Sequence, residues 1–216
     1  MKKYSLNSTL FFMSILLVAS AACQALTLTP DPTAAPQVDV QTEAPPTLPA
    51  QNGFQDKPAI PNDSGIEGVQ TFPDKAVYHN HVQTLDVPEG DMPPVFGAHF
   101  SAWQNCGMYD QPVELGSALH SMEHGAVWLT YRPDLEASQV SDLQARVRGH
   151  GYVLLSPYAS QKNTVVLTAW GVQLVIDSLP DERIAKFISY YEQGPQNPEA
   201  GAPCSGAIGE PMPYPL

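Results

Sequence analysis

The fold of this chain is decided between residues 112 and 133, which read PVELGSALHSMEHGAVWLTYRP. In the first half, apolar side chains recur at three- and four-residue steps, which is the period of an amphipathic helix: Leu115, Leu119 and Met122. Gly125 can take the left-handed backbone conformation that ends a helix. Residues 126–131 then form an apolar run that is typical of a strand buried on both faces. The stretch therefore predicts a helix over residues 112–124 that leads directly into a central strand.

Outward from this unit, apolar periodicity predicts two more helices, over residues 138–148 and 181–193, and three more strands, over 152–156, 165–170 and 172–176. The last two strands form either a hairpin that turns at Gly171 or one long strand with a bulge there. Residues 85–109 are rich in Pro and Gly and predict a long loop. The order of elements predicts an α+β domain, a small mixed or antiparallel sheet with helices packed on one face. A ferredoxin-like or a thioredoxin-like topology would fit this order.

The N-terminus has the pattern of an export signal over residues 1–22: two lysines, a short apolar run and small residues before Cys23. The apolar run is short for a permanent span, which needs about 20 residues to cross ~30 Å of hydrocarbon. Lipoprotein-type cleavage would leave Cys23 to be acylated, whereas ordinary cleavage near Ala21 or Ala22 would leave its thiol unmodified. Ser20 stands where a lipoprotein signal prefers leucine. We expect the lipoprotein alternative, because a tether follows.

Residues 23–64 are rich in Pro, Thr and Ala without helical or alternating periodicity, which predicts a long disordered Pro-rich tether. Residues 65–206 have the length of a single globular domain, and residues 207–216 form a Pro-rich tail. We therefore expect an extracytoplasmic protein that an N-terminal lipid anchors to the outer face of the bacterial cytoplasmic membrane. The net charge of −12 argues against nucleic acid as a partner and against a polybasic hold on anionic lipid. The sequence identifies no protein partner.

Besides Cys23, the chain has two cysteines, Cys106 and Cys204. In an oxidising compartment such a pair is expected to form a disulfide, which would tie the C-terminal tail to the domain. In the alternative interpretation Cys106 is a thiolate that binds a metal.

The most informative motif is His120-Ser-Met-Glu-His124. On a helix, residues four apart lie one above the other, so both imidazoles could reach one metal ion. Imidazole suits copper, zinc and nickel. If the segment were extended, His120, Met122 and His124 would share a face, and that mixture of donors favours copper(I). Gly125 favours the helix.

Other histidines gather in the same half of the domain, which weakens the interpretation that the pair merely stabilises a helix end: His79, His81 and His99. The hypothesis is a metal site in which His120 and His124 are the core ligands and His99 and His81 complete the set. Glu123 is either a ligand or a partner that orients an imidazole. Copper is the first choice of metal and zinc the second; a metal-free protein is the alternative.

Two other functions remain open. His-x-x-Glu-His is also the pattern of inverted zinc peptidases, in which the glutamate is the general base. Glu123 would then be catalytic, although this domain is small for a peptidase, and we lean against an enzyme. In the third hypothesis the domain is a non-catalytic cell-envelope interaction module whose histidines stabilise a polar core.

Several blocks resemble, in order, the bacterial domain of unknown function 3105 family: residues 80–82, 93–99, 103–109, 120–128, 156–158, 169–171 and 194–204. The resemblance covers about residues 75–206 and implies an extracytoplasmic or membrane-anchored protein with no settled activity. The family pattern includes counterparts of seven residues here, which supports treating them as a set: His81, His99, Cys106, His120, Glu123, His124 and Cys204. One position departs, because family members often carry glutamate where this chain has Gly116.

Overall fold

The computed structural model divides the chain into two units, residues 1–50 and Gln51–Leu216. It describes residues 64–73, 79–86 and 90–213, all in the second unit. The predicted signal, Cys23 and the tether up to residue 63 lie outside the described residues. Within the described ranges, no helix is both long enough and apolar enough to cross a membrane.

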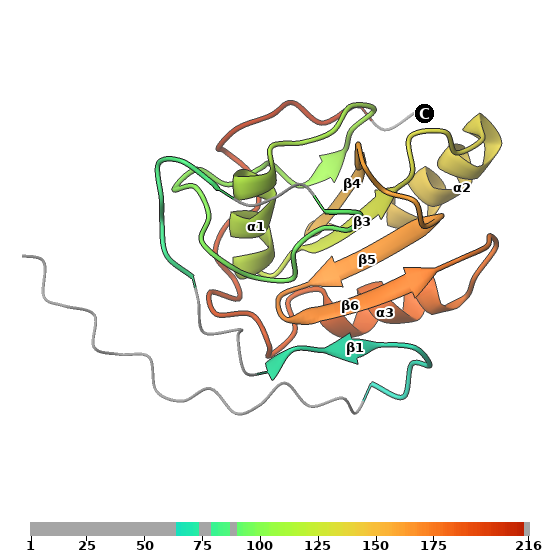
Figure 1. Ribbon diagram of the computed structural model, residues 1–216, viewed down its shortest axis with the longest axis horizontal. Coiled ribbons are helices and arrows are strands. Elements are labelled where there is room, and N and C mark those ends of the chain that lie inside the picture. The colour runs from blue at the N-terminus through green and yellow to red at the C-terminus, as the bar shows by residue number, and fades with distance from the viewer. Residues whose placement is uncertain (1–63, 74–78, 87–89, 214–216) are drawn as a thin grey trace, which may run out of the picture. The chain divides into compact units, whose positions relative to one another are not determined.

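The centre of the domain is a mixed six-stranded sheet in the order β1-β6-β5-β3-β4-β2 (Figure 1). The strands are β1 (Gln70–Thr71), β2 (Gly107–Met108), β3 (Val127–Tyr131), β4 (Val153–Pro157), β5 (Val165–Ala169) and β6 (Val172–Ile176). β3 pairs with β4 in parallel and with β5 in antiparallel orientation. β5 and β6 form a hairpin that turns at Gly171, whose φ of 71° suits glycine, so the hairpin alternative is confirmed over the bulged strand. The order β4-β3-β5-β6 is consistent with a thioredoxin-like topology.

The three helices are α1 (Leu115–Glu123), α2 (Ala137–Val147) and α3 (Arg183–Tyr191), and with the mixed sheet they confirm the predicted α+β fold. Side chains of α2 and α3 share one core with every second residue of β3, beginning at Val127. α1 packs on the other face of the sheet, against Trp128 and Trp170. The expectation that helices share one face therefore holds for α2 and α3 and fails for α1. All five residues of β3 are buried, because helices cover the sheet on both of its faces.

A disulfide holds the C-terminal segment against the loop that precedes α1. Cys106 and Cys204 are bonded, with their Cα atoms 5.3 Å apart and a sequence separation of 98. The predicted disulfide is confirmed, and the interpretation of Cys106 as a metal-binding thiolate is wrong. Beyond the bond, the backbone N–H of Asn105 donates to the carbonyl of Ile208 (2.8 Å), so residues of the predicted tail run along the domain.

Candidate metal centre

Two extended segments and the C-terminal half of α1 bring the histidines together. His81 and His99 face each other in a parallel β-bridge. The bridge is closed by two backbone hydrogen bonds, from Val82 N–H to the His99 carbonyl (2.8 Å) and from His99 N–H to the Asn80 carbonyl (3.0 Å). This pairing places the ring centroids of His81 and His99 5.0 Å apart.

His120 and Glu123 of α1 complete a group of four residues with His81 and His99. One potential ligand atom from each residue lies within 4.8 Å of the others. His99, His120 and Glu123 are buried, with exposures of 0%, 4% and 1%, while His81 is exposed. We refer to these four residues as the inner group. Its ligand atoms are close enough together that they could hold a metal ion, and the exposed His81 lies at the solvent side of the group.

Backbone carbonyls fix the orientation of three imidazoles. The Nδ1 atoms of His99, His120 and His124 lie 2.9, 2.7 and 2.7 Å from the carbonyl oxygens of Gly97, Phe100 and Pro203. A carbonyl only accepts, so Nδ1 carries the proton in each contact. Nε2 is then the atom left for binding, the arrangement typical of metal-bound histidine.

Glu123 contacts two imidazoles, those of His99 and His79. Its Oε2 is 2.9 Å from His99 Nε2 and its Oε1 is 2.7 Å from His79 Nδ1. Burial lowers the pKa of His99, but contact with Glu123 and with the Gly97 carbonyl outweighs it, and the pKa lies above the ordinary value. Burial also raises the pKa of Glu123, but contact with His99 and the charges of His99, His79 and His120 outweigh burial and hold that pKa below its usual value. A proton is therefore shared between His99 and Glu123 where a metal ion could bind.

His120 is neutral at physiological pH. Burial is the main cause that lowers the pKa of His120 to about 4, and the charges of His124 and His99 act in the same direction against the raising effect of the Phe100 carbonyl. A metal ion binds the neutral form of imidazole. His120 therefore needs no proton removed before it can act as a ligand.

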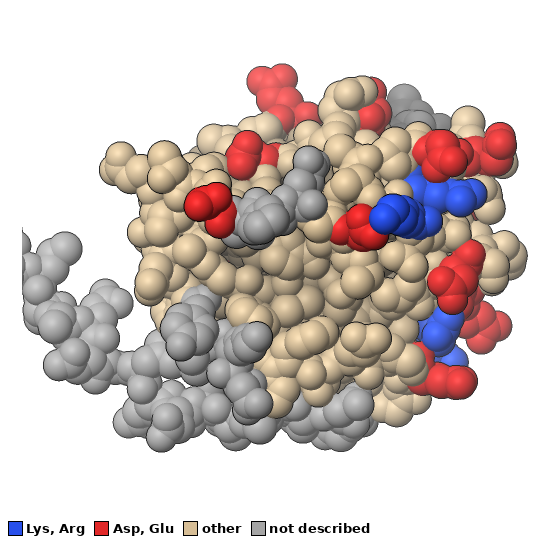
Figure 2. All heavy atoms as spheres, in the orientation of Figure 1, with Lys and Arg blue, Asp and Glu red and all other residues tan. Residues whose placement is uncertain are grey.

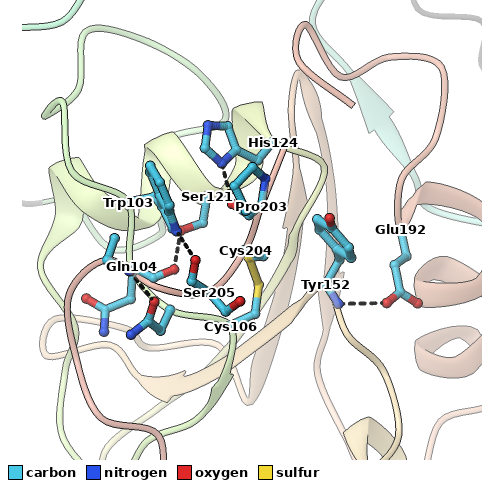
Figure 3. The surroundings of a disulfide bond; sticks show 12 residues. Trp103, Gln104, Cys106, Ser121, His124, Tyr152, Glu192, Pro203, Cys204 and Ser205 are labelled. Atoms are coloured by element: carbon cyan, nitrogen blue, oxygen red, sulfur yellow. Dashed lines mark hydrogen bonds between the residues drawn. A yellow bond between two sulfur atoms is a disulfide. The ribbon is translucent and has the colours of Figure 1, made fainter. Parts of the chain in front are cut away.

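His124 belongs to a second group, with His120 and Glu199. Its Nε2 lies 3.6 Å from Oε2 of Glu199. Its ring is tilted by 55° relative to that of Trp103, with ring centroids 5.0 Å apart. Figure 3 shows His124, Trp103 and Pro203 close together beside the disulfide. We refer to His120, His124 and Glu199 as the outer group. The structure thus brings together all five residues predicted as ligands, but it distributes them over two groups that share His120.

Gly116, the position at which the sequence departs from the family pattern, lies against Phe100. A Cβ atom at this position would lie 2.7 Å from Cδ2 of Phe100, so the Phe100 ring occupies the space of a side chain. The carbonyl of the same phenylalanine accepts the hydrogen bond from His120 Nδ1. Gly116 therefore allows Phe100 to approach α1 closely enough for its carbonyl to hold His120.

Two residues of the site were not predicted as ligands or partners. His79 stands two residues before His81, and this spacing, which puts both side chains on one face of an extended segment, is the signal that could have identified it. Glu199 had no signal in the sequence, because it follows α3 in an irregular segment. Its backbone N–H donates to the Glu123 carbonyl (3.1 Å), which ties that segment to α1.

No sulfur ligand occurs in either group of the described residues. The sulfur of Cys106 is in the disulfide, Met122 packs in the core between α1 and the sheet, and Met92 is 38% exposed. The extended His-Met-His face considered from the sequence is wrong, because residues 115–123 form a helix.

A family model described as protein of unknown function (DUF3105) matches residues 81–206, which include every member of both groups. No curated protein and no solved structure matches the chain.

Proposed function

The chain belongs to the DUF3105 family of proteins of unknown function, and we propose that it is a metal-binding domain whose inner group, His81, His99, His120 and Glu123, holds a divalent ion. The proposal is supported by the arrangement of the four side chains. One potential ligand atom from each lies within 4.8 Å of the others, and His99, His120 and Glu123 are buried. A buried group of imidazoles and a carboxylate at these distances fits an ion that they would share.

The donor set suits copper(II) or zinc. It consists of three imidazoles and one carboxylate, with no thiolate. Imidazole suits both metals, and copper(II) binds a given nitrogen and oxygen site more tightly than zinc does. Copper remains the first choice and zinc the second. Copper(I) fits a set of imidazole and carboxylate donors less well, because it prefers soft sulfur donors.

The structure gives less support to a zinc hydrolase. In that hypothesis Glu123 must accept a proton from water, which requires a pKa near the working pH. Contact with His99 instead outweighs burial and keeps the pKa of Glu123 below its ordinary value. Both carboxylate oxygens also lie against imidazoles rather than toward an open cleft. These contacts favour binding over hydrolysis.

We also propose an extracytoplasmic location, with an acylated Cys23 as the anchor. The disulfide supports an oxidising compartment. On the face drawn in Figure 2, acidic side chains outnumber basic ones and the described surface shows no basic patch, so a lipid is a better explanation of membrane association than surface charge. Cells that express the wild type should incorporate labelled fatty acid into the protein and retain it with membranes. A Cys23→Ser variant that stays membrane-bound without a label would contradict the anchor.

The decisive experiment is the metal content of residues 51–216, purified without affinity-tag histidines and then titrated with copper(II) and zinc. We expect uptake of about one ion per chain. A matched variant, His150→Asn, removes a histidine whose Nδ1 is paired with Glu192 at 2.6 Å, away from both groups, and should bind like the wild type. Absence of specific uptake would refute the metal site and favour a non-catalytic envelope module.

A further inference from the structure

The outer and inner groups meet at a single side chain. His120 is a member of both, and its Nδ1 is engaged by the Phe100 carbonyl at 2.7 Å, which leaves only Nε2 for a ligand bond. One nitrogen lone pair binds one ion, so His120 can complete the outer group or the inner group but not both at once. The two groups are therefore alternative positions for the same ion.

The outer group extends from solvent to the buried centre. The Glu199 side chain is 54% exposed, whereas that of His124 is 4% exposed. The ring centroids of His124 and His120 are 4.5 Å apart. The three side chains thus form a short line of donors that begins with a solvated carboxylate and ends at a ligand of the inner group.

The outer group is held in place by its own contacts. The Pro203 carbonyl accepts from His124 Nδ1, and the next residue, Cys204, is bonded to Cys106 (Figure 3). The backbone of Glu199 donates to the carbonyl of Glu123 at the end of α1. His124 is therefore presented with Nε2 toward Glu199, and the segment that carries Glu199 is attached to the inner group.

We infer that the outer group is an acquisition position that receives a hydrated divalent cation and passes it to the inner group. This inference rests on the proposed function. Glu199 and His124 bind the incoming ion, His120 Nε2 forms the next bond, and the ion then exchanges Glu199 and His124 for His99, His81 and Glu123. Coordination bonds form and break, water leaves the ion, and the proton held between His99 Nε2 and Glu123 Oε2 is released to solvent, while the charge of the ion is unchanged. The other route to the inner group is direct, past the exposed ring of His81.

Stopped-flow mixing of residues 51–216 with copper(II) distinguishes the two routes. Quenching of tryptophan fluorescence reports uptake, because two tryptophans lie beside the site. The ring centroids of Trp103 and His124 are 5.0 Å apart, and those of Trp170 and His99 are 6.0 Å apart. Glu199→Gln tests the outer group without disturbing the core, since this side chain is exposed. Glu136→Gln is the matched control, since it removes the same charge from an exposed glutamate at the start of α2.

We expect Glu199→Gln to slow uptake at least about threefold relative to Glu136→Gln, while the ratio of one ion per chain at saturation persists. His124→Asn should slow uptake further. Rates equal to the control in both variants would overturn the inference and assign uptake to the His81 side. Two ions bound per chain would also overturn it, because the shared nitrogen forbids that. Failure of the proposed function has a different signature, because the wild type itself would then take up no metal.

Discussion

Replacing His120 with asparagine removes the one ligand that both groups share. The side-chain amide of asparagine can donate to the Phe100 carbonyl that now lies 2.7 Å from His120 Nδ1, so the local hydrogen bond can be kept. The nitrogen that faces the other ligands is lost. Because His120 is neutral at pH 7, with its pKa lowered to about 4 mainly by burial, no charge is removed. The variant should therefore fold like the metal-free wild type and bind metal poorly.

The expected effect is a loss of metal-induced stabilisation. At a free metal concentration of about 100 times Kd, binding stabilises the folded state by about 2.7 kcal/mol. A folded unit of about 150 residues has an unfolding entropy of about 0.3 kcal/mol/K, so the Tm of the wild type should rise by about 8 °C. If the lost ligand raises Kd about 100-fold, the same metal stabilises His120→Asn by only about 0.4 kcal/mol, or about 1 °C.

The assay is differential scanning calorimetry of tag-free residues 51–216, with chelator and then with copper(II) or zinc. His150→Asn is the matched control and should show the full metal-induced shift. An equal shift in His120→Asn and in the control would show that the metal binds elsewhere. A large fall in the Tm of the chelated His120→Asn variant would instead show that the imidazole has a structural role.

Four further predictions follow from the same contacts. Glu123→Gln should weaken metal binding at least about tenfold in a copper titration, and any hydrolytic turnover that survives this change would exclude Glu123 as a general base. Without metal, the free energy of unfolding should fall by up to about 3 kcal/mol as the pH drops from 6.5 to 4. In this range unfolded His120 binds a proton, whereas folded His120 stays neutral because its pKa is lowered to about 4. Denaturant titrations of His120→Asn at the same pH values should lack this part of the pH dependence. Gly116→Ala should destabilise the domain by about 1–3 kcal/mol and weaken metal binding, because the added Cβ would displace Phe100. Metal binding equal to that of the wild type in a titration would show that the Phe100 carbonyl does not position His120. Removing the disulfide, whose cysteines are separated by 98 in sequence, with Cys106→Ala and Cys204→Ala should lower the free energy of unfolding by about 4 kcal/mol in a urea titration, and an unchanged free energy of unfolding would contradict the entropic account.

Local signals in the sequence determined the secondary elements and the candidate ligands. Apolar periodicity and Gly125 specified α1 and β3, and Gly171 marked the turn of the β5–β6 hairpin, because both depend on neighbours within a few residues. The pairing of Cys106 with Cys204 was predicted from the number of cysteines and from the expectation of an oxidising compartment, and the structure contains the bond. The candidate ligands were chosen from side-chain chemistry alone, since imidazole and carboxylate chemistry does not depend on the fold.

Only the tertiary structure decided how those ligands are divided. Residues four apart on a helix suggested that His120 and His124 belong to the core of one site. The bridge between His81 and His99 instead forms a group with His120 and Glu123 that leaves out His124, and His124 shares His120 with Glu199 in a second group. The position of α1 on the opposite face of the sheet from α2 and α3 also depended on long-range packing.

The position of Glu199 depends on contacts that no local pattern encodes. Its segment lies against α1 because the disulfide joins cysteines separated by 98 in sequence and because the Glu199 backbone N–H donates to the Glu123 carbonyl. The periodicity of a helix or strand is set by its own backbone, so sequence specifies it. A metal site is assembled from side chains of separate segments, and their distances are fixed only when the chain has folded.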